Sequence, residues 1–149
     1  MRSLIDISKA TDYPPNIQAI IKRPSEVSAW LGQSLLELDT DAGWVKIGYQ
    51  LTHAHFNRYG AIHGGTIAAI MDDVIATAAG LQLQWGEIAP TLEMKVSYLA
   101  QAREGRHIAE ARAVKRGRTI VFLEGSLNTE DGKLLATASA TLMITALKK

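Results

Sequence analysis

The sequence predicts an α+β fold in which an antiparallel β-sheet curls around one long, largely apolar helix. Residues 66–83 are rich in Ala and Ile and contain no proline, which favours a helix that is apolar over most of its circumference. Six other stretches alternate apolar and polar residues with the period of two that is typical of β-strands. Tight turns join most of these strands, so sequential neighbours should run antiparallel.

The predicted strands flank the helix, two before it and four after it. They are expected at residues 34–40, 44–51, 91–99, 107–115, 119–127 and 134–144. Asp41-Ala42-Gly43 supplies the first hairpin turn, and Gly117 and Glu130-Asp131-Gly132 mark the turns between the last three strands. A twisted sheet that wraps one central helix is the compact way to bury that helix, and this is the hotdog architecture.

The length of 149 residues predicts a single domain that spans residues 1–149. Residues 1–30 are expected to form an irregular, partly helical lead-in, because residues 12–30 hold three of the four prolines between short apolar patches. Ser25 is a plausible N-cap for one of the short helices in this segment.

Composition narrows the functional classes. Sixteen Lys and Arg residues against fifteen Asp and Glu residues give a net charge of +1, which predicts neither a nucleic-acid partner nor a membrane partner. There is no cysteine, so disulfides, cysteine zinc sites and thiol nucleophiles are excluded. The first ten residues do not resemble a signal peptide, and paired aspartates interrupt the most apolar stretch. We therefore expect a cytoplasmic protein.

The predicted helix opens with His63-Gly64-Gly65. Two glycines at this position allow a ligand to approach the backbone closely, and free N–H groups at a helix N-terminus suit an oxygen that gains negative charge. Gly64 and Gly65 are therefore candidates for contact with a substrate. The alternative is a tight turn that needs glycine for its conformation alone.

Asp72 lies on a helical face of small apolar residues, whereas Asp73 points about 100° away. A carboxylate on such a face is either functional or a paired structural group, and both interpretations stay open. Gly64 and Asp72 are about 12 Å apart along one helix. If both act on one atom, the aspartate must come from a second copy of the chain.

The chain resembles the PaaI-like branch of the hotdog thioesterases, which is related to the hydroxybenzoyl-CoA thioesterases. The pattern that carries this resemblance is Asn57-x-x-Gly60-x-x-His63-Gly64-Gly65, followed at the right spacing by Asp72. The resemblance runs from about residue 25 to residue 144. Further matches are Leu31-Gly32, Gly117-Arg118 and Asp131-Gly132.

The resemblance implies an acyl-CoA thioesterase that needs no cofactor and works as a homodimer or a homotetramer. Asp72 would be the nucleophile or the general base. The Gly64 N–H of the other subunit would polarise the thioester carbonyl, and His63 and Asn57 would orient the thioester or the water. Family members often carry Ser or Thr early in the following strand to contact the carboxylate or water, and Thr91 occupies that place.

Substrate contacts are less specific in the sequence. Phe56, Tyr59 and Trp85 are candidates for lining an acyl pocket, although packing would explain any one of them equally well. Arg116 and Arg118 belong to a basic cluster at the Gly117 turn, a region that the family places near CoA phosphates; the alternative is a solvated hairpin edge. His53 and His55 would share one side of a strand but lack a third ligand, so no metal is expected.

Two other functions compete with thioester hydrolysis. Hotdog hydratases and dehydratases carry a His-Phe-Pro-Gly-like segment, whereas His55-Phe56 is followed here by Asn57-Arg58. Non-catalytic acyl-CoA sensors of this fold carry a DNA-binding domain for which the chain has no spare length. Aryl, phenylacetyl-type and medium-chain acyl groups all stay open as substrates.

Overall fold

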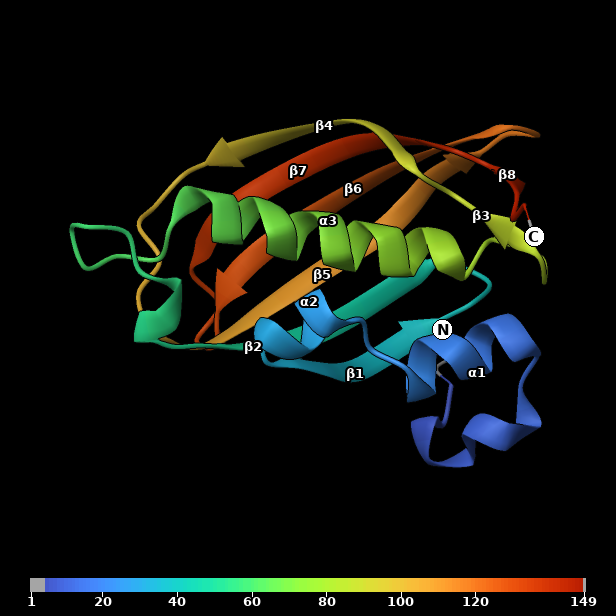
Figure 1. Ribbon diagram of the computed structural model, residues 1–149, viewed down its shortest axis with the longest axis horizontal. Coiled ribbons are helices and arrows are strands. Elements are labelled where there is room, and N and C mark those ends of the chain that lie inside the picture. The colour runs from blue at the N-terminus through green and yellow to red at the C-terminus, as the bar shows by residue number, and fades with distance from the viewer. Residues whose placement is uncertain (1–4, 149) are drawn as a thin grey trace.

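A computed structural model describes residues 5–148 and has one main sheet of six strands. The strands are β1 Gln33–Asp39, β2 Trp44–Leu51, β4 Thr91–Tyr98, β5 Gly105–Arg116, β6 Ile120–Thr129 and β7 Leu134–Met143. Their order across the sheet is β1-β2-β5-β6-β7-β4, and every neighbouring pair is antiparallel. The predicted hotdog fold is confirmed, since the long helix α3 (Gly64–Gly80) lies across one face of this sheet (Figure 1).

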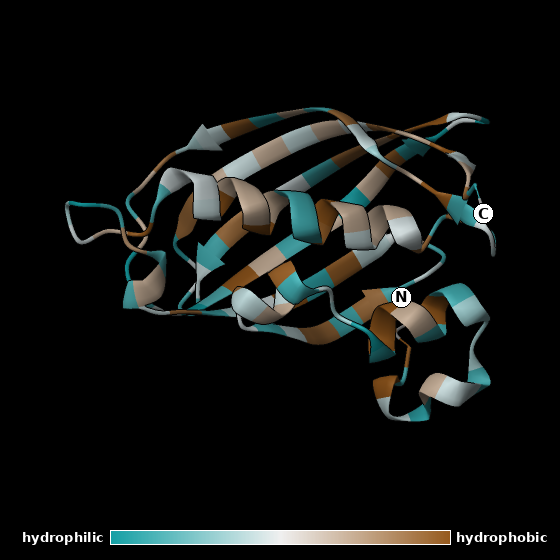
Figure 2. Ribbon diagram, viewed as in Figure 1, coloured by the Kyte–Doolittle hydropathy of each residue, from teal (hydrophilic) through white to brown (hydrophobic). Residues whose placement is uncertain are grey.

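The core forms where α3 meets the sheet. Ile70, Met71, Val74 and Ile75 are fully buried there, and apolar residues recur along the helix and the strands behind it (Figure 2). Gly125 of β6 allows this close approach, because a Cβ at that position would lie 3.0 Å from Met71 Cε. Burial of each large apolar side chain stabilises the fold by roughly 1.5–3 kcal/mol.

The predicted boundaries are correct to within a few residues. The helix begins two residues before the predicted 66–83 because His63 serves as its N-cap. At the first hairpin, one Asp39 carboxylate oxygen accepts the N–H groups of Asp41 and Ala42, and Gly43 adopts a positive φ of 56°. The short sheet of β3 (Glu87–Ile88) and β8 (Thr145–Ala146) was not predicted, because two residues carry no periodicity.

The lead-in is helical, as expected. It contains η1 (Ile7–Asp12), α1 (Pro15–Lys22) and α2 (Glu26–Trp30), and Ser25 caps α2 by accepting the Ser28 N–H at 3.0 Å. Figure 1 shows these helices beside the main sheet, with α1 near the C-terminal end of α3. Within residues 5–148, no helix has both the length and the apolar character needed to cross a membrane.

Candidate active site

The N-terminus of α3 presents one open backbone donor. His63 Nδ1 accepts the Gly65 N–H at 2.9 Å, and His63 O accepts the N–H groups of Thr66 and Ile67 at 2.9 and 3.2 Å. Among residues 5–148, no group accepts a hydrogen bond from the Gly64 N–H. Gly64 is also partly exposed. The helix end therefore has one donor available for an incoming oxygen, at the predicted position.

Tyr98 of β4 supports this helix end and was missed in the sequence. Its hydroxyl donates to Gly64 O at 2.9 Å, and the N–H of the same peptide group, that of Gly65, donates to His63 Nδ1. One peptide group thus links Tyr98 to the His63 ring. Because Nδ1 accepts a hydrogen bond, the neutral ring carries its proton on Nε2. A contact made through a backbone carbonyl leaves no residue pattern from which it could be found.

The two adjacent aspartates have different environments. Asp72 is partly exposed, and its side chain accepts one hydrogen bond among the described residues, from Thr91 Oγ1 at 2.9 Å. The predicted contact between Thr91 and the carboxylate is therefore present. The small-residue side of α3 that carries Asp72 is only partly covered within the single chain: Ala76 is exposed and Ala68 is partly exposed, whereas Ala79 is buried.

Asp73 is a structural carboxylate. Its Oδ1 accepts from Ser28 Oγ at 2.6 Å, and its Oδ2 accepts from Gln33 Nε2 at 3.0 Å and Tyr49 Oη at 2.6 Å. Burial, followed by the neighbouring Asp73 charge, raises the pKa of Tyr49 far above its ordinary value, so the phenol stays protonated and donates. Asp73 thus ties α2, β1 and β2 to α3, and both of its carboxylate oxygens are engaged.

Asn57 shapes the loop in front of the helix. Its Oδ1 accepts the N–H groups of Tyr59 and Ala61 at 2.9 and 3.2 Å, so only its amide Nδ2 is left to face a substrate or water. Tyr59 is 82% exposed on this loop and does not line the cavity beside the helix. The structure therefore does not bring Tyr59 together with Phe56.

A cavity of about 330 Å³ lies beside the N-terminus of α3. Phe56 lines it from the segment before the helix, and His63 and Gly65 line it from the helix end. The remaining lining residues are Trp30, Ala54, His55 and Thr66. Two of the predicted substrate contacts, Phe56 and Gly65, therefore share one cavity that adjoins the open Gly64 donor.

The prediction that His53 and His55 lie on a strand is wrong. They form the 3-10 helix η2 (His53–His55), which Thr52 caps. His55 is buried, with Nδ1 accepting the Thr52 N–H at 3.0 Å and Nε2 donating to Trp30 O at 3.0 Å. Both ring nitrogens are thus engaged. Residues 5–148 contain no group of three or more His, Cys, Asp or Glu side chains placed to hold a metal ion.

The basic residues predicted to bind CoA lie at the opposite end of α3. Arg116 Nε donates to Gln82 O at 2.9 Å, just beyond the helix C-terminus, and its guanidinium is 3.7 Å from Glu87. Arg118 is exposed on the same hairpin. Trp85 is also exposed and borders a separate cavity at this end. None of these three residues approaches Gly64 of its own chain closely enough to share a cavity with it.

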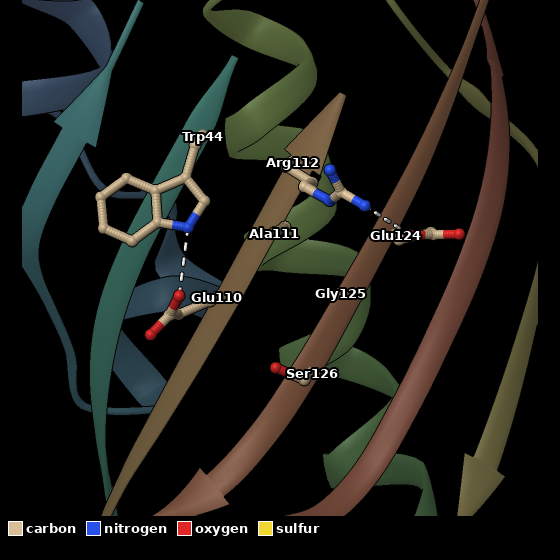
Figure 3. Close-up of a pocket in the computed structure, with 7 residues that line it drawn as sticks. All are labelled: Trp44, Glu110, Ala111, Arg112, Glu124, Gly125 and Ser126. Carbon is tan, nitrogen blue, oxygen red and sulfur yellow. Dashed lines mark hydrogen bonds and ion pairs between the residues drawn. The ribbon is translucent and has the colours of Figure 1, made fainter. Parts of the chain in front are cut away.

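Another depression, of about 320 Å³, lies on the side of the sheet that faces away from α3 (Figure 3). Four of its polar side chains form two pairs: Trp44 Nε1 donates to Glu110 at 3.1 Å, and Arg112 lies 3.4 Å from Glu124. It contains none of the predicted catalytic residues, so the helix end remains the candidate active site.

Comparison with known proteins gives the family. Residues 59–136 match the Thioesterase superfamily. Human acyl-coenzyme A thioesterase 13 is 28% identical over 137 residues, which cover 91% of this chain and 89% of the human protein. The phenylacetic acid degradation-related protein of Ralstonia eutropha has a TM-score of 0.81 and 33% identity, and the match covers 87% of this chain and 99% of that one.

The PaaI protein of E. coli shares the fold at 18% identity, with a TM-score of 0.79 over 93% of this chain and 95% of its own. Membership of a thioesterase family favours hydrolysis over the hydratase and sensor alternatives. The chain belongs to the Thioesterase superfamily and is a PaaI-like hotdog thioesterase.

Proposed function

We propose that the enzyme hydrolyses an acyl-CoA thioester to the free acid and CoA. The observation that carries this proposal is the contrast between two neighbouring aspartates in the middle of α3. Asp73 accepts three hydrogen bonds on its two oxygens, whereas Asp72 accepts one among the described residues and keeps a carboxylate oxygen without a partner there. The CoA substrate is supported by the name of the human relative, acyl-coenzyme A thioesterase 13.

In this mechanism the Gly64 N–H donates to the thioester carbonyl oxygen, which gains negative charge as the carbonyl carbon is attacked. Asp72 either attacks this carbon itself or takes a proton from the water that attacks. Attack breaks the C–S bond, and the CoA thiolate leaves and takes up a proton. If Asp72 attacks, water then hydrolyses the acyl–aspartate anhydride and restores the carboxylate.

Three neighbours would assist these steps. Thr91 holds one carboxylate oxygen at 2.9 Å and leaves the other free. His63 presents Nε2–H, and Asn57 presents its amide Nδ2. His63 and Asn57 are hydrogen-bond donors that can orient the thioester carbonyl or the water, whereas the Thr91 hydroxyl donates to Asp72.

We propose that one active site uses two chains. Gly64 and Asp72 stand about 12 Å apart along the same helix, which is too far for both to reach one carbonyl group. Two surfaces support pairing with a second copy: the partly uncovered, small-residue side of α3 around Asp72, and the edge strand β4, where Leu92 is 56% exposed. A homodimer would bring Asp72 of one chain to Gly64 of the other, and two dimers could form a tetramer.

We also propose that the enzyme works as one domain in the cytoplasm, without a cofactor. Arg116 and Arg118 would contact the CoA phosphates, with Arg118 the more available because Arg116 already pairs with Glu87.

A thiol-release assay over a panel of acyl-CoA substrates tests this function. Wild type should release CoA, and Asp72→Asn should lower kcat by roughly 10²-fold or more, because the amide removes the nucleophile or base but little volume. Circular dichroism must show that the variant is folded. If folded Asp72→Asn turns over as fast as wild type, Asp72 is not the catalytic carboxylate.

A further inference from the structure

The loop before α3 holds an exposed tyrosine in a fixed position. Asn57 closes this loop, because its Oδ1 accepts the N–H groups of Tyr59 and Ala61 and its own N–H donates to Ala61 O at 2.7 Å. Tyr59 is nevertheless 82% exposed, and its hydroxyl has no hydrogen-bond partner among residues 5–148. The neighbouring Arg58 is also exposed and forms no ion pair within that range. An aromatic ring presented in this way is typical of a contact surface.

The loop projects past the N-terminus of α3, at the end of the molecule opposite to β3 and β8 (Figure 1). Helix α3 has 17 residues and is about 25 Å long, so Tyr59 cannot reach the far end of its own helix. A partner for Tyr59 at that end must belong to a second copy of the chain.

A surface cavity of about 460 Å³ lies at the far end of α3. Its wall is mostly apolar and includes Ile20, Leu83 and Trp85, of which Trp85 is 72% exposed. Glu87 is the one charged residue among the described residues that line it. One Glu87 oxygen faces Arg116 at 3.7 Å, and the other has no partner in the described part of the chain. The cavity thus suits a phenol ring that is accompanied by a cation.

The proposed two-chain active site determines how two copies face each other. In a two-fold dimer, a contact from Gly64 to Asp72 implies the reciprocal contact. The two α3 helices then run antiparallel, and the axis passes midway between these residues, at Ala68. Residues equally far from Ala68 on its two sides face each other, so Ala76 and Gly80 lie opposite segment 56–60 of the second copy. Gly80 lines the cavity, so this segment arrives beside it.

The exposure of α3 agrees with this arrangement. A stripe of exposed or partly exposed residues follows the helix at steps of three or four, from its entrance to the cavity. It consists of Gly65, Ala68, Asp72, Ala76 and Gly80. Small side chains on this stripe allow a second helix to approach closely.

We infer that Tyr59 of one copy docks in the cavity beside Trp85 of the other, with Arg58 directed towards Glu87. This inference rests on the two-chain site of the proposed function and adds a second contact between the same two chains. The loop also carries Asn57, so docking holds that amide at the active site that the dimer forms. Tyr59, a predicted substrate contact, is thus an interface residue.

Cysteine cross-linking tests this contact, because the chain has no cysteine of its own. Tyr59→Cys/Gln84→Cys places one thiol on the loop and one in the cavity wall, at opposite ends of α3. A short bifunctional maleimide should link two such chains on a denaturing gel. Tyr59→Cys alone should stay monomeric there, and so should Tyr59→Cys/Val27→Cys, since Val27 is 54% exposed but does not line the cavity.

Removal of either ring should weaken the dimer. Tyr59→Ala should raise the dissociation constant of the dimer about tenfold or more in analytical ultracentrifugation, because the contact occurs twice in each dimer. Trp85→Ala should have a similar effect, and the double variant should be little weaker than either, because both substitutions remove the same contact. Tyr59→Phe should keep most of the affinity, and Val27→Ala is the matched control.

Ala68→Cys distinguishes the possible failures, since two thiols at the axis should form a symmetric disulfide. If Ala68→Cys cross-links and Tyr59→Cys/Gln84→Cys does not, the helices pair as proposed but the cavity has another occupant, which overturns the inference. If neither cross-links, or if Tyr59→Cys links to itself, the antiparallel arrangement is wrong as well. Failure of wild type to hydrolyse any acyl-CoA would refute the proposed function and leave the cross-linking result standing.

Discussion

The Thr91 hydroxyl donates a 2.9 Å hydrogen bond to Asp72 Oδ1 and thereby joins the edge strand β4 to the middle of the central helix. The bond holds one carboxylate oxygen and leaves the other free of hydrogen bonds among residues 5–148. The adjacent Asp73 has no such freedom, because Ser28, Gln33 and Tyr49 all donate to it.

Thr91 should act as a positioning residue for Asp72. Thr91→Val keeps the shape of the side chain but removes the donor, and we expect kcat to fall by about three- to tenfold because the carboxylate can then rotate. Thr91→Ser retains the hydroxyl and should stay within about twofold of wild type. Steady-state kinetics measures both. Equal rates for the Val and Ser variants would show that the hydrogen bond has no part in turnover.

The two aspartates should differ in stability as well as in activity. Asp73→Asn replaces one carboxylate oxygen by an NH2 group that faces the donors of that oxygen, Ser28 alone or Gln33 and Tyr49, so we expect the free energy of unfolding to fall by about 1–3 kcal/mol. Asp72→Asn should change it by less than about 0.5 kcal/mol, since the residue is partly exposed and has one partner. Urea denaturation of both variants measures this difference. A larger loss for Asp72→Asn would contradict the assignment of Asp73 as the structural group.

The Tyr98 hydroxyl should support the N-terminus of α3, and its removal should affect turnover rather than folding stability. In Tyr98→Phe the ring stays against Gly64 but the bond to Gly64 O is lost, so the peptide group that orients His63 is held less firmly. We expect kcat to fall by about two- to fivefold with KM little changed. Kinetics and the ¹⁵N signals of the His63 ring report the two effects. An unchanged Nδ1 signal together with full activity would argue against the link.

His107 predicts a pH dependence of stability. Burial lowers the pKa of His107, and the hydrogen bond from its Nδ1–H to Gly105 O only partly opposes this. The unfolded chain takes up the proton near pH 6.5, above the lowered folded pKa, so the unfolded state binds more protons as pH falls. The stabilisation is thus present above about pH 6.5 and is lost towards the folded pKa.

This pH dependence can be measured as the midpoint of urea denaturation of wild type and of His107→Gln at pH 8, 6.5 and 5. The difference between the two proteins should shrink as pH falls, because only wild type loses the contribution of a neutral buried imidazole. Parallel decline of both midpoints across this range would show that His107 does not contribute to the pH dependence.

The fold could be predicted from the sequence because the patterns that specify its elements are local. The period of two in the strands, the glycines at the turns and the long Ala- and Ile-rich segment each specify an element without reference to the rest of the chain. The His63-Gly64-Gly65 helix entrance is likewise a local signal, whereas the choice of Asp72 over Asp73 as the catalytic carboxylate rests on the resemblance to PaaI-like thioesterases and stays a prediction.

The features that were missed depend on contacts between distant segments. The partly uncovered side of α3 around Asp72 depends on where the sheet ends. The bond from Tyr98 reaches a backbone carbonyl, which any residue could supply. His53 and His55 alternate as strand residues do, but the Thr52 cap and the bond from His55 to Trp30 O favour a 3-10 turn.

The composite active site can be tested with two inactive chains. Gly64 is the first residue of α3, where proline is well tolerated, and His63 before it has φ −62° and ψ 137°, which a following proline accepts. Gly64→Pro therefore deletes the N–H donor with little strain. Gly64→Ala is the matched control, because it keeps the N–H and its Cβ would lie 3.6 Å from the Tyr98 ring, an ordinary contact.

The deciding measurement is the thioesterase activity of Gly64→Pro co-refolded with Asp72→Asn. Each parent must first be shown to be folded, oligomeric and nearly inactive, with Gly64→Ala active. In a mixed dimer one site combines an intact Gly64 N–H from one chain with an intact Asp72 from the other. Random exchange makes half of the dimers mixed, so the account predicts recovery of about a quarter of wild-type activity. Subunit exchange between folded parents without any recovery of activity would contradict a site that uses both chains.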